Sequence, residues 1–233
     1  MSENLPSPSP SVPPPTKRRL YVYVDGYNLF NGMKDAGFKR FYWLDLWKLG
    51  KALEGSSSDL KHVRYFTTYS SGARPWHNKA MGWDREQSRL RQYQYIEALK
   101  TLSPECFSIF FGAFRDEPRE CTRCRNSYLN LTEKMTDVRL ASQIILDAVD
   151  DLFDVAIIVS ADTDQTPPIE ICRERWPSKG VFVAFPPKRK SEDLRKVAKA
   201  CLNINESMLR NGQFPDEIQR PGKSSLKRPP EWA

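Results

Sequence analysis

The chain has 233 residues, of which 39% are hydrophobic and 28% charged, and its formal net charge is +7. A membrane-spanning helix needs about 18 consecutive apolar residues, and no apolar run of the sequence approaches this length, which excludes a membrane-spanning protein. Its first residues are Ser and Pro instead of a hydrophobic leader, and five Cys without an export signal are typical of a reducing compartment. We therefore expect a cytoplasmic protein with one medium-sized domain, whose basic surplus suits an anionic partner.

Both ends of the chain differ in composition from the middle. Residues 1–19 are rich in Pro and Ser and close on three basic residues, which predicts a disordered arm. Residues 213–233 carry Pro, Lys and Arg without a pattern that could bury a core, which predicts a flexible basic tail. The folded domain is therefore expected over residues 20–212.

Strand-like and helix-like segments alternate along this domain. Runs of β-branched and aromatic residues predict five strands, at Leu20–Asp25, Lys61–Thr68, Phe107–Phe111, Asp154–Ser160 and Gly180–Phe185. Helical spacing of apolar residues predicts helices between and after them, at Leu44–Leu53, Asn78–Leu102, Asp137–Val149, Pro168–Trp176 and Glu192–Leu202. This alternation is typical of βαβ units, so the sequence predicts an α/β sandwich with a mostly parallel sheet of about five strands.

Acidic residues follow two of the predicted strands. Asp25 ends the first strand, and Asp162 and Asp164 follow the fourth. Ligands of open α/β sheets bind beyond the carboxyl ends of the strands, so we expect these residues near one binding edge. Asp137 begins the helix that leads back to the fourth strand, although Asp is also an ordinary residue at a helix N-terminus.

Several carboxylates at one edge of a sheet repel one another unless a cation lies between them. Mg²⁺ and Mn²⁺ take oxygen ligands, and such an ion suits phosphodiester hydrolysis because it activates water and neutralises developing charge. Asp162 is the better ligand candidate of the two acids after the fourth strand. Asp164 would bind a second ion, orient water or cap the helix that follows.

Four segments together resemble the NYN family of PIN-like nucleases, in its LabA/DUF88-type branch: YVYVDGYNLF, EKMTDVRLASQIILDA, DVAIIVSADTDQTPPI and GVFVAFPP. The resemblance implies a Rossmann-like three-layer α/β/α fold and a metal-dependent ribonuclease. It places the family's acidic cluster, which would hold Mg²⁺ or Mn²⁺, at Asp25, Asp137 and Asp162. Asp164 stands beside this cluster, and the Asn of the first motif is Asn28, which would orient a ligand or a phosphate.

Two of these motifs extend or depart from the acidic set. The EK-x-x-D segment of the family corresponds here to Glu133 and Lys134, and Lys134 is also a candidate RNA contact. The last acidic motif is commonly S-G-D-S-D followed by an apolar residue, whereas this chain has Ala161, Thr163 and then Gln165. Both carboxylates remain, so the resemblance implies an intact acidic set.

Basic and aromatic residues interleave between positions 61 and 100, with eight Lys or Arg against three acids. Basic side chains contact phosphates, and aromatic rings stack on unpaired bases. The part after the second predicted strand lacks helical spacing, so we expect Arg74 and Trp76 on an RNA-facing loop. Lys188 and Arg189, after the fifth strand, would contact the RNA backbone, although a plain basic loop covering the sheet is an equal alternative.

Cys121 and Cys124 form a CxxC pair, which is half of a tetrahedral zinc site. Cys106 could join them if the following strand folds back, and a CxxC before the EK segment also occurs in NYN relatives. We favour reduced thiols packed in a loop or hairpin over a structural Zn²⁺ ion. A thioredoxin-type redox role does not fit, because the surrounding βαβ context is wrong.

The sequence therefore predicts a divalent-metal-dependent endoribonuclease that acts on single-stranded or structured RNA. The first alternative is an RNA-binding or scaffold module with an idle metal site. The second is a DNA-directed nuclease of the same fold, because the basic residues do not distinguish one sugar from the other. The sequence leaves the oligomeric state open.

Overall fold

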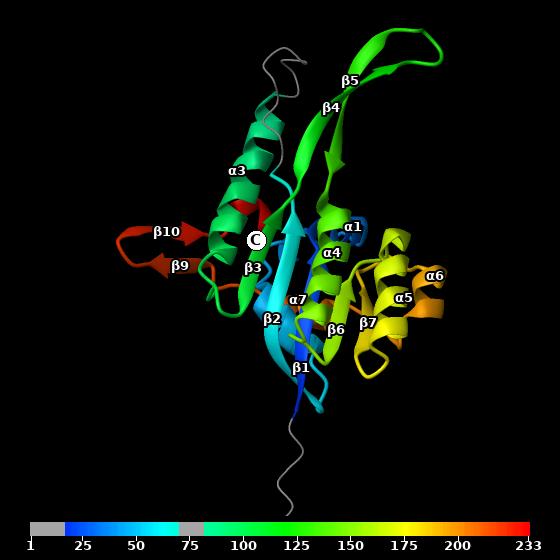
Figure 1. Cartoon of the computed structure of the whole chain (residues 1–233). Helices are drawn as coiled ribbons and strands as arrows, with labels where there is room; N and C mark the ends of the chain where they lie inside the picture. Colours follow the sequence, from blue (N-terminus) through cyan, green and yellow to red (C-terminus); the bar gives the residue numbers. More distant parts are fainter. Residues whose placement is uncertain (1–16, 70–81) are drawn as a thin grey trace, which may run out of the picture.

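A six-stranded sheet forms the centre of the computed structural model, which describes residues 17–69 and 82–233 (Figure 1). Every pair of neighbouring strands is parallel, and the strand order is β3-β2-β1-β6-β7-β8. The strands are β1 (Arg18–Asp25), β2 (Ser58–Thr67), β3 (Phe107–Phe111), β6 (Val155–Val159), β7 (Gly180–Phe185) and β8 (Cys201–Asn203). The predicted α/β class and parallel sheet are confirmed, and β8 adds a strand where a helix was expected to continue.

Helices cover both faces of the sheet, as the alternation of side chains along β1 requires. Leu20, Val22 and Val24 belong to the core on one face, whereas Tyr23 belongs to the core on the other. The first face packs against α1 (Gly26–Asp35), α2 (Leu46–Leu53), α3 (Gly82–Leu99) and α7 (Glu206–Asn211). The second packs against α4 (Thr136–Val149), α5 (Thr166–Arg175) and α6 (Glu192–Val197).

The three layers of the fold account for the residue pattern of the central strands. β6 is buried along its whole length because helices cover it on both sides, as expected for a parallel strand. Helix α1 was not predicted, since its sequence GYNLFNGMKD carries two glycines and only a short apolar stripe. Within the described part of the chain, no helix is long and apolar enough to cross a bilayer.

A two-stranded hairpin interrupts the alternation between β3 and α4. β4 (Ala113–Glu120) pairs antiparallel with β5 (Ser127–Lys134), and the hairpin projects from the carboxyl end of the sheet away from the body (Figure 1). In its turn, the Cys121 N–H donates to the Asn126 carbonyl at 2.9 Å, and the Arg125 N–H donates to the Cys121 carbonyl at 2.8 Å. The hairpin was not predicted because its strands, AFRDEPRE and SYLNLTEK, carry many polar residues and no continuous apolar run.

The prediction of a flexible tail over residues 213–233 is wrong. This segment forms β9 (Glu217–Arg220), β10 (Lys223–Lys227) and a short 3-10 helix, Pro230–Trp232. Trp232 is only 8% exposed and lies against the rings of Tyr42, Trp43 and Tyr95. Isolated aromatic residues thus anchor a segment that has no apolar periodicity of its own.

The predicted N-terminal arm ends earlier than expected. Residues 1–16 lie outside the described part of the chain, but Arg18 and Arg19 already belong to β1. The Arg19 guanidinium pairs with Asp151 at 3.0 Å and with Asp154 at 2.8 Å. These basic residues therefore fasten the start of the central strand, instead of closing a free arm.

Candidate metal centre and nucleic-acid interface

The candidate site lies where the winding of the sheet reverses. β1 and β6 are neighbours in the strand order, and the chain proceeds outward from them in opposite directions. Ligands of open α/β sheets bind at such a switch point, outside the carboxyl ends of the strands. Asp25 is the last residue of β1, and residues 160–164 directly follow β6.

Three carboxylates converge beside this point. Asp137, from the first turn of α4, and Asp162 and Asp164, after β6, each offer an oxygen within 4.8 Å of the other two. Two oxygens on opposite sides of a Mg²⁺ ion lie about 4.2 Å apart, so small side-chain rotations would suffice to bind one ion. An all-oxygen set also suits Mg²⁺ or Mn²⁺ better than a soft metal. The donor set therefore fits the expected ion.

Asp25 lies behind this group and is not one of its three members. Its carboxylate is 3% exposed, accepts the Asn28 N–H at 3.0 Å and accepts the Ser160 hydroxyl at 2.9 Å. Burial, helped by the charges of Asp137 and Asp162, raises the pKa of Asp25 to about 6, although both hydrogen bonds oppose the shift. Asp25 therefore stands within the electrostatic reach of the three converging acids.

Ser160 connects Asp25 to the loop that carries the other acids. Its hydroxyl donates to Asp25 and accepts the Asp162 N–H at 3.0 Å, and the side chain is completely buried. A role for Ser160 could not be predicted from the acidic motif, because a hydroxyl alone carries no metal-binding signal. Its position directly before two acids at a strand end was the available clue.

Asn28 has a positioning role in this geometry. Its side-chain oxygen accepts the Ala161 N–H at 3.1 Å and so joins the start of α1 to the loop after β6. Asp162 in turn accepts the Asp164 N–H at 3.0 Å, which closes the turn that contains both acids. Hydrogen bonds from two elements thus hold the acidic loop before any ligand binds.

Gln165, which replaces an apolar residue of the family motif, is fully buried next to this loop. Neither its amide oxygen nor its amide nitrogen has a hydrogen-bond partner among the described residues. A buried amide without a partner is destabilising, so Gln165 in place of an apolar residue should lower the stability of the fold. The sequence alone did not reveal this effect.

The structure describes only some of the predicted RNA contacts. Arg74 and Trp76 lie outside the described residues, and so do the side chains of Glu133 and Lys134, although both belong to β5. The Arg189 guanidinium pairs with Asp35 of α1 at 2.5 Å and thus fastens the loop after β7.

Two other basic residues differ in their surroundings. Lys188, in the loop after β7, is exposed and remains a candidate RNA contact. Arg64, counted in the basic stretch, instead lies inward, where it pairs with the buried Asp147 at 2.5 Å. Arg64 therefore belongs to the interior of the fold and not to an RNA-binding surface.

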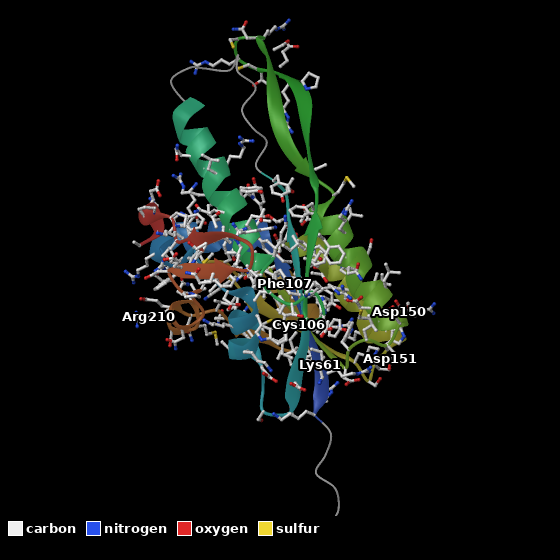
Figure 2. All side chains as sticks on the ribbon, turned by 90° about the vertical axis from the view of Figure 1, so that its left-hand side faces the viewer. Lys61, Cys106, Phe107, Asp150, Asp151 and Arg210 are labelled. Atoms are coloured by element: carbon white, nitrogen blue, oxygen red, sulfur yellow. The ribbon has the colours of Figure 1, made fainter. Side chains whose placement is uncertain are left out.

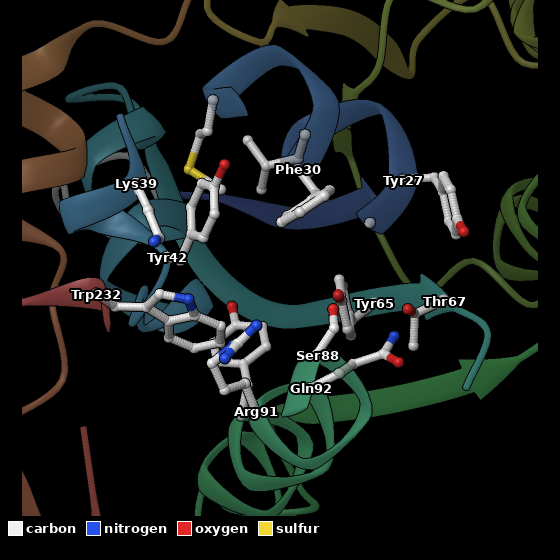
Figure 3. Close-up of a pocket in the computed structure, with 14 residues that line it drawn as sticks. Tyr27, Phe30, Lys39, Tyr42, Tyr65, Thr67, Ser88, Arg91, Gln92 and Trp232 are labelled. Carbon is white, nitrogen blue, oxygen red and sulfur yellow. The ribbon is translucent and has the colours of Figure 1, made fainter. Parts of the chain in front are cut away.

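A pocket of about 290 Å³ opens directly beside Asp25, between α1, β2 and α3 (Figure 3). Gly26 and Tyr27, the next two residues of the chain, line it, and the C-terminal Trp232 lies on the opposite side. Most of the other lining side chains are aromatic or polar: Phe30, Tyr42, Tyr65, Tyr95, Lys39, Ser88, Arg91 and Gln92. Sequence reasoning missed this pocket because the fold brings together segments far apart in the chain.

The CxxC pair lies at the tip of the β4–β5 hairpin. This position agrees with the expectation that the two thiols belong to a loop or hairpin. Cys124 is exposed and Cys121 half-buried. Hydrogen bonds from the backbone of Cys124 and Arg123 lower the pKa of the Cys121 thiol. Cys106 does not join the pair, because it precedes β3 whereas the hairpin follows the carboxyl end of that strand.

Comparisons with known proteins agree with the α/β fold described above. The family model for the NYN domain matches residues 19–205. A 6-hydroxy-3-succinoylpyridine 3-monooxygenase from Pseudomonas putida is 26% identical over 92% of this chain and 75% of its own length. A crystal structure of a protein of unknown function from Vibrio parahaemolyticus covers 82% of this chain and 94% of its own, with a TM-score of 0.51 and 18% identity. The last likeness concerns the fold alone.

Proposed function

Since the chain belongs to the NYN domain family, whose fold is that of PIN-like nucleases, we propose that it is a divalent-metal-dependent ribonuclease that cleaves within RNA chains. The observation that carries the proposal is the convergence of Asp137, Asp162 and Asp164 within 4.8 Å at the switch point of the sheet. Three carboxylates this close repel one another unless a cation binds between them. A cation at this position suits a reaction at phosphate, where negative charge develops.

Each acidic residue has a distinct task in the proposed site. Asp137, Asp162 and Asp164 would hold Mg²⁺ or Mn²⁺, which when bound supplies a Lewis acid for the phosphate and an activated water. Asp25 adds a fourth negative charge behind them and, through Ser160, fixes the backbone of Asp162. Asn28 holds the same loop from α1, so the ligands are positioned before RNA arrives.

The aromatic pocket supports a nucleic-acid substrate at this site. Tyr27 and Phe30 are 44% and 42% exposed at its wall, and Lys39 adds a positive charge. Aromatic rings stack on unpaired bases regardless of sequence, and basic groups contact the backbone. A single strand that crosses the acidic group would therefore place a neighbouring base in the pocket.

The test uses end-labelled single-stranded and hairpin RNA with Mn²⁺ or Mg²⁺, with and without EDTA, and matched DNA strands. We expect EDTA-sensitive cleavage of RNA. Asp162→Asn and Asp164→Asn should each lower the cleavage rate by more than about 100-fold, since even hydrogen-bond partners of metal ligands can cost that much. Asp150→Asn is the matched control, because Asp150 lies at the far end of α4 (Figure 2).

Each other result selects a different function. Cleavage that persists in both site variants would reveal a contaminating nuclease. Tight RNA binding without cleavage would favour the binding or scaffold module with an idle metal site, and equal cleavage of DNA would favour the DNA-directed enzyme. Turnover of 6-hydroxy-3-succinoylpyridine instead of RNA would assign the chain the chemistry named for its Pseudomonas relative.

A further inference from the structure

The tip of the β4–β5 hairpin carries a pair of thiols that the proposed nuclease site does not use. Cys121 and Cys124 lie in the turn between the two strands, where Cys124 is exposed and Cys121 half-buried. The hairpin raises this turn above the carboxyl edge of the sheet, away from the helical layers (Figure 1). The two thiols are therefore presented outward by an extended arm.

The backbone of this turn is folded around the first sulfur. Hydrogen bonding from the backbone of Cys124 and Arg123 lowers the pKa of the Cys121 thiol, and the Arg125 N–H donates to the Cys121 carbonyl at 2.8 Å. Arg125, the residue after the pair, has a φ of 58°, a left-handed conformation that non-glycine residues seldom adopt. The turn is thus shaped so that N–H groups face one sulfur, which is the environment that a thiolate ligand needs.

The described residues of one chain supply only half of a tetrahedral thiolate site. A structural zinc ion takes four protein ligands, commonly four Cys. The carboxylate group at the sheet edge is the one cluster of three or more metal-ligating side chains in the described ranges, and it contains neither Cys. Figure 2 labels Cys106 on the body of the molecule, well below the hairpin tip.

The charges at the hairpin tip favour a zinc site whose other two ligands come from the tip of a second copy. The turn, residues 121–126, contains Arg123 and Arg125 and no acidic residue, so two bare tips would repel each other. A Zn²⁺ ion with four thiolates carries a net charge of −2, which offsets this basic surplus. The projecting hairpin also allows two tips to meet while the bodies stay apart (Figure 1).

We propose that two copies of this chain join at their hairpin tips by sharing one Zn²⁺ ion, bound by Cys121 and Cys124 of each copy. This zinc site is separate from the carboxylate group and does not depend on the nuclease activity. Joining the tips would link two copies through their hairpins, with the two bodies apart.

The experiment measures metal content, mass and coordination of the full chain, purified with a reductant and zinc. We expect one zinc per two chains and a mass by light scattering of twice 27.0 kDa. Replacing zinc with Co²⁺ should produce the absorption of a tetrahedral tetrathiolate complex, which a metal bound at carboxylates cannot produce. Cys121→Ser and Cys124→Ser should abolish the cobalt spectrum and yield monomers, whereas Cys106→Ser should leave both unchanged.

Three results would overturn the proposal. One thiolate-bound metal per monomeric chain would mean that a single copy completes the site. A dimer that persists in Cys121→Ser after loss of the cobalt spectrum would place the interface elsewhere. A chain that binds no metal at its thiols, with circular dichroism showing a folded protein, would leave the pair as plain reduced thiols or a local disulfide.

Discussion

Asp25 combines deep burial with a place among the acids of the candidate site. It is 3% exposed, yet two hydrogen bonds reach its carboxylate, from Asn28 and from Ser160. Burial outweighs these bonds and raises the pKa of Asp25 to about 6. A cation bound nearby would therefore stabilise the charged form of Asp25 and lower its raised pKa.

The raised pKa of Asp25 predicts a pH-dependent stability for the metal-free protein. Well below the unfolded-state pKa of about 3.9, the carboxyl is protonated in both states and does not change the stability with pH. As the pH rises from about 4 to about 6 the unfolded form ionises first, so stability falls by about 3 kcal/mol and then levels off. In urea titrations with EDTA, Asp25→Asn should therefore be more stable than wild type at pH 7 and equal to it near pH 4. The prediction would be contradicted if the difference in unfolding free energy between wild type and Asp25→Asn were the same at both pH values.

Replacing the buried Gln165 should also raise the free energy of unfolding. Its buried amide lacks a partner among the described residues, so Gln165→Leu should raise the free energy of unfolding by about 1–3 kcal/mol. The same change at the exposed Gln219 is the matched control and should be nearly neutral. Chemical denaturation at pH 7 measures both, and a destabilised Gln165→Leu would show that the amide has a partner after all.

At the scale of elements, Asp147 fastens helix α4 to the sheet. It is 1% exposed and accepts hydrogen bonds from Tyr23 of β1 at 2.7 Å and from Gln143 at 2.8 Å. The Arg64 guanidinium of β2 adds two more bonds, at 2.5 and 2.8 Å. Because Asp137 begins the same helix, this network also determines where one of the candidate metal ligands lies.

Removal of the Asp147 carboxylate should destabilise the whole domain. Asp147→Ala leaves Arg64 as a charge without its partner in a mostly buried position, which costs about 3–5 kcal/mol. Asp150→Ala, three residues along the same helix but exposed, should change stability by less than about 0.5 kcal/mol. Urea denaturation followed by circular dichroism compares the two variants, and equal midpoints would refute a structural role for the network.

At the scale of the whole molecule, the C-terminal segment closes the face of the sheet that carries α1 and α2. The Trp43 indole donates to the Pro215 carbonyl at 2.8 Å, and Trp232 packs on the ring of Trp43. Trp232 also lines the pocket beside Asp25, so residues at the two ends of the chain share one surface. The segment therefore contributes both to the core and to the candidate RNA-binding pocket.

Truncation of this segment provides a test of that packing. Trp232→Ala should lower the free energy of unfolding by about 3–5 kcal/mol, as expected for removal of a buried aromatic side chain. Deletion of residues 216–233 should lower it at least as much, whereas Lys223→Ala, at an exposed position of β10, should be neutral. Thermal melts measure all three, and an unchanged melting temperature after the deletion would restore the flexible-tail prediction.

The elements that could be predicted from sequence are those whose burial follows a local pattern. Continuous apolar runs located β6 and β7, and helical spacing located α4, because both faces of the sheet are covered. The β4–β5 hairpin and the short β8 escaped prediction, since their sequences carry no continuous apolar run and each strand is defined by its pairing with a neighbour. The same reasoning separates Asp162, found from its place after a strand, from Ser160, whose role depends on a contact 135 residues away.

The sequence by itself determined the family, the layered α/β class and the acids that would meet at one edge. These features depend on local periodicity and on the rule that parallel strands end at a common edge. Only the tertiary structure decided that Asp164 completes the converging group while Asp25 stays behind it, that Arg64 is internal, and that the C-terminal segment packs on the core. The physical reason is that burial and pairing are set by neighbours distant in the chain.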